Sequence, residues 1–504
     1  MEPNNLYQSI NLILPEIVLS ASLLILVLAD IIFHKDKRLI PYIAAIGIAV
    51  TGAFVINQFG LSGFAFQSSS QTLRDYGLIV VDSFGVFFKL IVILSSIFIV
   101  FFSLSSDEII NVKDRVGEYY ALIFGMILGM FFMISSIDLI PIYLSLELLS
   151  LSSYVLAGFT KLQARSSEAA LKYLLYGAVS SGLMLFGISL IYGLTGSTNL
   201  YIINSLIQGP HVNLFTLSLA VILIFVGIGY KISSAPFHFW TPDVYEGAPI
   251  TITAFLSVAS KAAGFALLIR FIKITFVSFT NDNGEWTLIN VFDWQSVLVA
   301  ISVLTMTLGN FSALWQNNLK RMLAYSSIAH AGYLLLGIVV LTNQGLLAVL
   351  IYLIVYMLMN LGAFLVVMLV ANKTNSEEID VYNGIGYTSP LLGVSFAIFL
   401  ISLTGLPPTA GFIGKLYLFA ALVDAKMITV AVIALLNSVV SLYYYARVLK
   451  HMYLVKATES TPSVIPSLGG RILILILVIP ILVFGIYFGP LVNLAKSCLV
   501  IIGL

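Results

Sequence analysis

The sequence predicts an all-α, polytopic membrane protein. Of its 504 residues, 60% are hydrophobic and 9% are charged, whereas soluble domains carry about 25% charged residues. The mean hydropathy of +1.05 is too high for a water-soluble core. A membrane-spanning helix needs about 20 predominantly apolar residues, and segments of this kind recur about fourteen times along the chain.

The predicted spans form one membrane domain, because no stretch rich in Pro, Gly or Ser divides them. They lie at residues 12–33, 39–58, 80–103, 119–137, 139–159, 171–195, 214–235, 250–275, 296–315, 323–342, 345–371, 389–424, 427–451 and 470–493. We expect spans 1–3 to form an N-terminal part (1–110) and spans 4–8 a first repeat (111–275). Spans 9–13 then form a second repeat (296–451), and residues 470–504 hold the last span.

Two of these spans are interrupted. The seventh carries Gly227, Gly229 and Lys231 and then Ala235-Pro236, and the twelfth contains Gly-Leu-Pro-Pro-Thr-Ala-Gly at 405–411. Proline removes a backbone donor and clashes with the preceding turn. Such backbone is tolerated at membrane depth only where it is buried in protein or lines a cavity. Breaks at matching places in two halves are typical of inverted-repeat transporters.

The spacing of ionisable residues supports two repeats. Lys231 and Lys415 are 184 positions apart, and Glu147 and His330 are 183 positions apart. We therefore expect Lys415 to be the counterpart of Lys231. Each repeat has five spans, and because this number is odd, the second repeat begins on the opposite side of the membrane. The predicted fold is thus a pair of inverted five-helix repeats with broken helices.

Basic residues fall mainly into the loops on one side. With the N-terminus outside, fifteen lie in cytoplasmic loops and their flanks: Lys35, Lys37, Arg38, Lys113, Arg115, Lys161, Arg165, Lys172, Lys320, Arg321, Lys373, Arg447, Lys450, Lys456 and Arg471. Five lie on the other side: Arg74, Arg270, Lys273, Lys426 and Lys496. The positive-inside rule then predicts that both termini are non-cytoplasmic. Met1 to Gln8 contain no basic residue, so we expect the first span to be retained rather than cleaved as a signal peptide.

Four lysines, Lys89, Lys231, Lys261 and Lys415, and one carboxylate, Glu147, lie inside stretches that are otherwise apolar. A lone Lys at the bilayer centre costs about 2.5–3.5 kcal/mol, and intramembrane charge commonly marks an ion pathway. Burial disfavours a charge and a neighbouring opposite charge restores it. A buried Lys beside a carboxylate can therefore be switched between holding and releasing a proton. We interpret the chain as an ion-conducting membrane subunit.

Each candidate has a structural alternative. Glu147 and Lys231 form either a proton-transfer pair or a fixed ion pair that locks two helices. Lys261 lies among small residues that suit close helix packing and is either a relay group or a structural one. His330 either shuttles protons or only makes hydrogen bonds.

Two further positions complete the candidates. Lys415 follows the second break and is the expected last relay group, whereas Lys89 lies outside the repeats and is expected to be structural. We expect His238, Trp240, Asp243 and Glu246 to form a cytoplasmic loop after span 7, from which His238 could pass protons to the channel.

Redox and nucleotide sites are not supported by the sequence. The single cysteine, Cys498, can build neither an iron–sulfur site nor an internal disulfide. Gly384-Ile385-Gly386 lacks the third glycine of a dinucleotide-binding motif, and no P-loop occurs. Of the histidines, only His330 clearly lies within a span, so paired haem ligands are not expected.

One motif carries a family resemblance. It is Trp-Thr-Pro-Asp-Val-Tyr-Glu-Gly-Ala-Pro at 240–249, followed by Thr-Ala-Phe-Leu-Ser at 253–257 and Ser260-Lys261. Further matching stretches are 145–148, 167–173, 317–328 and 405–412. Over its whole length the chain resembles the subunit N family of bacterial NADH–quinone oxidoreductase (respiratory complex I). It departs from the family at Ile250-Thr251, where Thr-Pro or Thr-Thr is common.

The resemblance implies an antiporter-like proton channel, itself without a redox centre, within a proton-pumping enzyme complex. Glu147, Lys231, Lys261 and Lys415 align with the family's channel residues, and His330 aligns with its central histidine. NADH, FMN, iron–sulfur clusters and quinone are implied in other subunits. The implied partners are other membrane subunits, including sister antiporter-like subunits, and the lipid bilayer, with no nucleic acid. The implied location is the cell (inner) membrane or, alternatively, the thylakoid membrane.

Two other classes of protein would explain part of this sequence pattern. An ion-translocating subunit of a multi-subunit Na⁺/H⁺ antiporter would share the fold and the intramembrane lysines but would have no redox partner. A passive membrane anchor would explain the hydrophobicity but not several buried charges.

Overall fold

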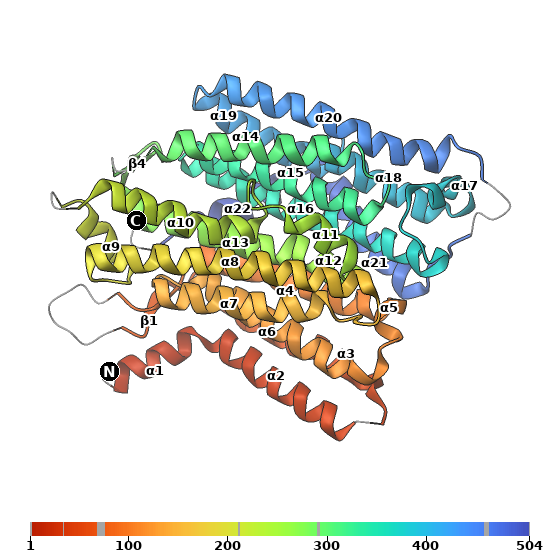
Figure 1. The fold of residues 1–504 in the computed structure, drawn as a ribbon, viewed down its shortest axis with the longest axis horizontal. Helices are drawn as coiled ribbons and strands as arrows, with labels where there is room; N and C mark the ends of the chain where they lie inside the picture. Colours follow the sequence, from red (N-terminus) through yellow and green to blue (C-terminus); the bar gives the residue numbers. More distant parts are fainter. Residues whose placement is uncertain are drawn as a thin grey trace.

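The structure is a computed structural model that describes residues 3–33, 35–67, 76–209, 212–289, 293–457 and 463–502. Arg74, one of the basic residues counted above, lies outside the described residues. Long helices run side by side along the longest axis of the molecule (Figure 1). The described ends of the chain lie at one end of this bundle (Figure 1).

The first half of the chain contains α1 (Pro3–Leu12), α2 (Leu14–Ile32), η1 (Lys37–Leu39), α3 (Ile40–Asn57), β1 (Gly63–Ala65), β2 (Ile79–Val81), α4 (Ser83–Ser103), α5 (Asp107–Ile110), η2 (Lys113–Arg115), α6 (Val116–Ser135), α7 (Leu139–Ala157), α8 (Ala164–Thr195), α9 (Leu200–Ile207), α10 (Leu214–Ile232), α11 (Trp240–Gly247), α12 (Ile250–Phe255), η3 (Leu256–Ser260) and α13 (Lys261–Phe276). Strands β1 and β2 pair antiparallel, with Phe64 opposite Val80. The turn η3 is a π-helix.

The second half contains β3 (Val277–Thr280), β4 (Trp286–Leu288), α14 (Trp294–Ala313), α15 (Leu319–Val339), α16 (Asn343–Thr374), η4 (Ile379–Tyr382), α17 (Ile385–Thr388), α18 (Pro390–Thr404), α19 (Ala410–Asp424), α20 (Ile428–Tyr453), α21 (Leu468–Ile486) and α22 (Gly489–Ser497). Strands β3 and β4 form a second antiparallel pair, with an irregular register between Val277 and Phe279.

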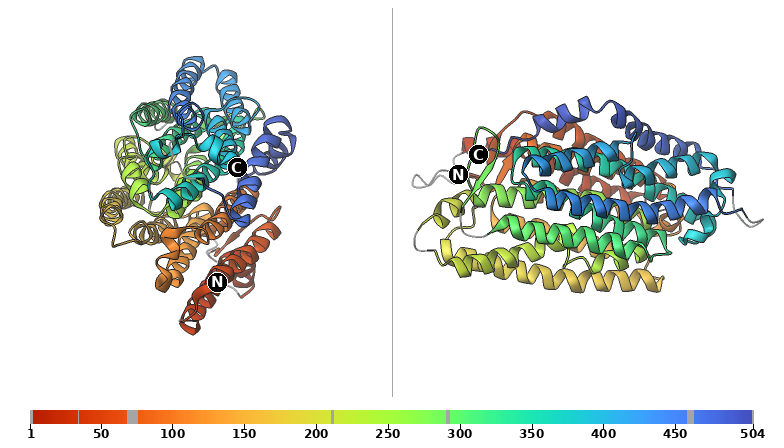
Figure 2. Two further views of the ribbon diagram at one scale, coloured as in Figure 1. Left: turned by 90° about the vertical axis from the view of Figure 1, so that its right-hand side faces the viewer. Right: turned by 90° about the horizontal axis from the view of Figure 1, so that it is seen from above.

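The predicted spans are confirmed. Among the described residues, 13 helical segments are long and apolar enough to cross a membrane. The twelfth predicted span is divided into α18 and α19, each shorter than a full crossing. Of the long segments, Ile250–Phe276 is buried throughout, while α8, α20 and α21 are about one-third buried. The end-on view shows the segments of α2 and α3 at the edge of the bundle (Figure 2).

The two halves share local structure that defines the repeats. Asp138 caps α7 and Asn318 caps α15, 180 positions later, each through a side chain that accepts a backbone N–H. Asp138 forms an isolated bridge with Asn199, and Asn318 forms one with Glu378. Such side-chain caps satisfy backbone donors that a helix start leaves free. Both α8 and α16 are 32 residues long and end at a residue of left-handed conformation.

The helix breaks correspond in the same way. After α10, Ser233 has φ 61°, and after α18, Gly405 has φ 88°. The N–H of Ser234 bonds to the carbonyl of Gly229, and the N–H of Leu406 bonds to that of Ile401. The two left-handed residues are 172 positions apart, so this is the offset of the repeats at the breaks.

This offset contradicts the expected equivalence of Lys231 and Lys415. Lys231 lies two residues before the left-handed residue of its break, and Lys415 lies ten residues after the left-handed residue of its own. Their spacing of 184 positions is therefore not the repeat period. In α7 and α15, where the offset is 180, Glu147 corresponds to Ser327, and Ser150 corresponds to His330.

The segment expected as a loop after span 7 is also different. Trp240 to Gly247 form the helix α11, which packs against α8 and α15. Lys172 of α8 lies 2.6 Å from Asp243, and Arg321 of α15 donates to Asp243 and Glu246 at 2.8 and 2.7 Å. His238 and Trp240 are buried. The motif around Trp240 therefore continues the seventh span beyond its break.

Candidate functional site

Lys231 lies in the last turn of α10, beside the first break, and is 1% exposed. Its ammonium group lies 3.1 Å from the hydroxyl of Ser150 on α7 and 5.8 Å from the centre of the Tyr173 ring. The glycines of this turn are required by close packing. A Cβ on Gly229 would lie 2.8 Å from Phe237, and one on Gly227 would lie 2.5 Å from the sulfur of Met184.

Glu147 lies on α7 one turn before Ser150 and acts electrostatically on Lys231. The two charged groups form no ion pair within 4.0 Å among the described residues. The two members of the predicted pair are thus not in direct contact, and Lys231 contacts the Ser150 hydroxyl instead. One carboxylate oxygen of Glu147 is buried and has no hydrogen-bond partner among the residues that the structure describes.

Lys261 follows directly on the π-helical turn η3. Its ammonium donates to the carbonyl of Ser327 at 2.8 Å and to the hydroxyl of Ser327 at 2.6 Å. That hydroxyl lies 2.7 Å from the hydroxyl of Tyr356 on α16. Single π-turns inside helices occur frequently at functional sites. Here the π-turn directly precedes Lys261, whose side chain contacts Ser327 of α15.

His330 lies one turn after Ser327 on α15 and is 2% exposed. One ring nitrogen lies 2.6 Å from the hydroxyl of Tyr352, and the other lies 3.4 Å from the hydroxyl of Tyr445 on α20. Lys261 and Lys415 both act on the ring electrostatically. The histidine thus contacts tyrosine hydroxyls of α16 and α20, and its role as a central relay group stays a prediction.

Lys415 lies in α19, after the second break, and is 4% exposed. Its ammonium donates to the carbonyl of Thr404 at 2.7 Å and to the hydroxyl of Ser438 at 2.9 Å. It also lies 4.7 Å from the centre of the Tyr333 ring. Gly405 is required here for two reasons, its positive φ and the Lys415 side chain, which would lie 2.6 Å from a Cβ.

Hydroxyl groups lie beside the lysines and the histidine of this row. Sequence reasoning missed these hydroxyls, which belong to Ser150, Ser327, Ser438, Tyr352, Tyr356 and Tyr445. Each can donate and accept a hydrogen bond, which suits them to pass protons between amines and imidazole. Ser and Tyr are frequent throughout the sequence, so only tertiary contact distinguishes these from the others.

Lys89 belongs to a different site. Its ammonium lies 2.6 Å from the carboxylate of Glu16 on α2, and both side chains are 2% exposed. Sequence reasoning expected Lys89 to be structural but missed Glu16. Asp82, seven residues before Lys89, instead caps α4 and pairs with Arg270 of α13.

Arg270 was counted with the basic residues on the non-cytoplasmic side, and the structure shows it fully buried in α13. Its guanidinium donates to both oxygens of Asp82 at 2.9 Å and to the carbonyl of Ile134 at 2.9 Å. A fork of parallel donors matches a carboxylate in this way. The pair joins α4, α6 and α13. As for metals, the described residues contain no group of three or more His, Cys, Asp or Glu side chains that could hold an ion.

A multi-pass helical bundle with two broken spans and a buried row of Lys and His side chains defines an antiporter-like ion-translocating membrane protein. A family described as NADH:quinone oxidoreductase/Mrp antiporter, transmembrane, matches residues 136–441. The chain is 48% identical over 494 residues to NADH-quinone oxidoreductase subunit N 2 of Chloroherpeton thalassium, covering 97% of this chain and 94% of the relative. It is 45% identical over 502 residues to subunit N of Chlorobium chlorochromatii, covering 98% and 96%.

Solved structures show the same fold. A chain of respiratory complex I from Thermus thermophilus with bound aureothin is similar with a TM-score of 0.77 and 30% identity, covering 95% of this chain and 98% of that one. A chain of the Mrp complex from Dietzia sp. is similar with a TM-score of 0.81 and 19% identity, covering 97% of each. The chain belongs to the NADH:quinone oxidoreductase/Mrp antiporter family of membrane subunits.

Proposed function

We propose that this chain is the antiporter-like subunit N of a NADH:quinone oxidoreductase and that it translocates protons through the row Glu147, Lys231, Lys261, His330 and Lys415. Quinone reduction elsewhere in the complex drives this translocation. NADH, FMN, iron–sulfur clusters and quinone belong to other subunits. The relatives named subunit N, at 48% and 45% identity over nearly the whole chain, support this function.

One contrast among the buried cations carries the proposal. Lys89 and Arg270 each contact a carboxylate, as expected of a buried structural charge. Lys231, Lys261 and Lys415 contact hydroxyl and carbonyl oxygens instead. Neutral acceptors leave an ammonium without a fixed counter-charge, so these lysines can give up a proton without leaving a carboxylate unpaired.

The relay works by changes of protonation at neighbouring groups. Glu147 supplies the charge that favours a proton on Lys231, and the Ser150 hydroxyl contacts the Lys231 ammonium. A proton leaving Lys261 reaches His330 along α15 through Ser327 and the tyrosine hydroxyls. Lys415 accepts the proton at the far end of the row. Each step transfers one proton from one group to the next, and no proton is consumed.

The orientation follows from the basic loops. The ends rich in Lys and Arg face the cytoplasm, and both termini face the non-cytoplasmic side of a bacterial cell membrane. The partners are the other membrane subunits of the complex and the surrounding lipid. Exposed apolar side chains along α8 and α20, such as Leu175, Val179 and Leu436, suit both kinds of contact.

A sodium/proton antiporter subunit is the second candidate, because the Mrp chain shares the fold. At 19% identity that similarity concerns the fold alone. The two functions differ in a measurable way, since only the first couples proton movement to electron transfer from NADH to quinone.

The test uses the intact complex reconstituted in vesicles. Lys261→Met should assemble, as judged by native gel, and should lose NADH-driven proton uptake. The matched control is Lys89→Met combined with Glu16→Gln, which removes a buried cation together with its carboxylate and should leave proton uptake near the wild-type rate. Normal proton uptake by the assembled Lys261→Met complex would refute the proposed relay.

A further inference from the structure

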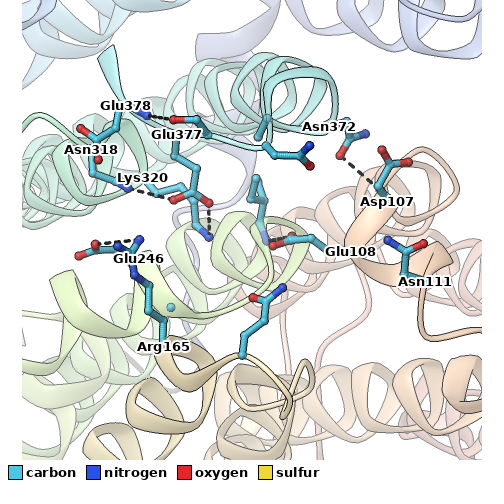
Figure 3. Close-up of a pocket in the computed structure, with 16 residues that line it drawn as sticks. Asp107, Glu108, Asn111, Arg165, Glu246, Asn318, Lys320, Asn372, Glu377 and Glu378 are labelled. Atoms are coloured by element: carbon cyan, nitrogen blue, oxygen red, sulfur yellow. Dashed lines mark hydrogen bonds and ion pairs between the residues drawn. The ribbon is translucent and has the colours of Figure 1, made fainter. Parts of the chain in front are cut away.

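A pocket of about 550 Å³ opens beside α5 (Figure 3), at the end of the bundle opposite the described termini (Figure 1). We call it the α5 pocket; it is lined by α5, by the turn between α11 and α12, and by the ends of α15 and α16. Five carboxylate residues, Asp107, Glu108, Glu246, Glu377 and Glu378, line it together with Lys320 and Arg165. None of them belongs to the row described above.

Two residues of opposite charge on the floor of the α5 pocket, Glu108 and Lys320, both bond to the turn from Ala248 to Ile250. Glu108 accepts a hydrogen bond from the N–H of Ile250 at 2.8 Å. Lys320, which is 2% exposed, donates to the carbonyl of Ala248 at 2.8 Å and lies 2.9 Å from Glu377. The turn from Ala248 to Ile250 leads directly into the fully buried span that carries Lys261.

The position of Glu108 is set by contacts of α5 with α16. The side chain of Asn372 donates to the carbonyl of Ser105 at 2.6 Å and accepts from the N–H of Asp107 at 3.3 Å. These two bonds hold the single turn of α5 over the start of α12. The Glu108 carboxylate therefore reaches the pocket and the backbone of the span at the same time (Figure 3).

Polar groups continue from the floor towards Lys261. The hydroxyl of Tyr119, on which Glu108 acts electrostatically, donates to Thr251 at 2.8 Å. Deeper in the span, Asn360 donates to the hydroxyl of Ser257 at 2.6 Å. The amide oxygen of Asn360 is buried and has no partner among the described residues, and buried polar groups usually bond to protein or to ordered water.

The distance between the α5 pocket and Lys261 is short enough for a proton to be transferred in a few steps. Ile250 and Lys261 are 11 residues apart, which corresponds to about 16 Å along a helix. Tyr245 of α11 is fully buried, and its hydroxyl has no hydrogen-bond partner among the described residues. Hydroxyl and amide groups thus lie on both sides of the span between the α5 pocket and Lys261.

We propose that the α5 pocket is the cytoplasmic proton intake for Lys261 and that Glu108 is the group that takes up the proton from water. The proposal rests on the proton-translocating function and orientation proposed above. A hydrated proton in the pocket binds the Glu108 carboxylate. The resulting carboxylic acid passes the proton along the hydroxyl groups to the neutral amine of Lys261, and the carboxylate is restored.

The electrostatic surroundings of Glu108 suit this exchange. Burial raises the pKa of the Glu108 carboxyl, while the Lys320 ammonium and the Ile250 N–H favour its charged form, and Glu377 opposes them. A carboxyl group is most effective in proton transfer when its pKa approaches the working pH. Lys320 is a positioning residue here, because it holds Glu377 and the Ala248 turn beside the carboxyl group.

The first experiment compares Glu108→Gln with Glu118→Gln in the intact complex in vesicles. Both variants replace a glutamate by glutamine, and at position 108 the Gln keeps an oxygen for the Ile250 N–H. Glu118 on α6 is exposed, does not line the α5 pocket and serves as the control. We expect Glu108→Gln to lower the initial rate of NADH-driven proton uptake by roughly tenfold or more and Glu118→Gln to leave it nearly unchanged. Wild-type uptake in assembled Glu108→Gln would overturn the proposal.

A second experiment separates proton uptake from a structural role of Glu108. Formic or acetic acid added on the cytoplasmic side should restore activity several-fold in Glu108→Ala, because the α5 pocket admits these acids and they can replace the missing carboxyl. The readout is membrane potential, which a neutral permeating acid does not dissipate, and wild type with the same acid is the reference. If Glu108→Gln is impaired and no acid restores the activity of Glu108→Ala, then Glu108 only positions α12 and the proposed proton intake is refuted.

The same measurements distinguish failure of the intake from failure of the proposed function. Loss of pumping in Lys261→Met with normal pumping in Glu108→Gln would support the proposed relay and would disprove the α5 pocket as its proton intake. Normal pumping in both variants would disprove both proposals.

Discussion

The Lys261 ammonium donates to both the carbonyl and the hydroxyl of Ser327, at 2.8 and 2.6 Å. By the offset of 180 positions between α7 and α15, Ser327 stands where the first repeat has Glu147. In the first repeat, Glu147 therefore lies near Lys231. Its counterpart in the second repeat, Ser327, instead contacts Lys261 through a hydroxyl and a carbonyl. This difference makes the two repeats chemically unequal at the centre of the row.

The Ser327 hydroxyl joins Lys261 to Tyr356. Ser327→Ala keeps the carbonyl bond but interrupts this connection, so we expect proton uptake by the assembled complex to fall several-fold, whereas Ser327→Thr retains most of it. Ser302→Ala is the control, since the Ser302 hydroxyl on α14 is equally buried and donates to the carbonyl of Gly332 on α15, the helix that carries Ser327. Equal rates in the Ser327→Ala and Ser302→Ala complexes would show that this hydroxyl is not part of the relay.

Lys231→Ala should abolish most proton uptake and slow the coupled quinone reduction, because within the described part of the chain no other lysine lies in the helix turn before the first break to hold the transferable proton. Glu147→Gln should have a smaller effect, since the amide keeps hydrogen bonds but loses the charge that acts on Lys231. Both rates are measured in vesicles and normalised to assembled complex. An assembled Lys231→Ala complex with wild-type proton flux would contradict the assignment.

Lys415→Arg tests proton exchange at the second break. A guanidinium stays protonated in proteins, so Arg preserves the charge near Thr404 and Ser438 but cannot release a proton. We expect assembly to be retained and proton uptake to be inhibited, while Lys415→Glu keeps partial function because a carboxyl group can titrate. Full pumping by the Arg variant would indicate a structural role for Lys415.

The Asp82–Arg270 pair is expected to matter for stability rather than for transport. Removing one partner of a buried pair costs about 3–5 kcal/mol, because the other charge is left uncompensated. Asp82→Asn should therefore reduce the amount of assembled complex on a native gel. Asp82→Leu combined with Arg270→Met removes both charges and should restore much of the assembly. Pumping per assembled complex should be unchanged in both cases, and a loss there would place the pair in the proton path.

The orientation is tested by reporter fusions. A reporter at residue 504 should be active only as an enzyme that requires export, because the basic loops predict non-cytoplasmic termini. A second fusion within the turn after α16, near Lys373, should show the opposite pattern. Cytoplasmic reporter activity at residue 504 would refute the proposed topology.

The sequence by itself determined the class of protein and the candidate lysines. Apolar segments of spanning length predict helices because backbone groups in lipid must bond within the segment. The breaks at Pro236 and Pro407 were visible because proline interrupts that bonding. Lys231, Lys261 and Lys415 were visible because a charge in an apolar run is costly.

Only the tertiary structure decided which partner each charge has and how the repeats align. Residues far apart in sequence, such as Glu16 and Lys89, meet through helix packing, which no local pattern encodes. The spacing of Lys231 and Lys415 suggested an equivalence that the positions of Ser233 and Gly405 contradict. Loop lengths differ between the halves, so the repeat offset changes along the chain, and only the backbone conformation at each break defines the matching residues.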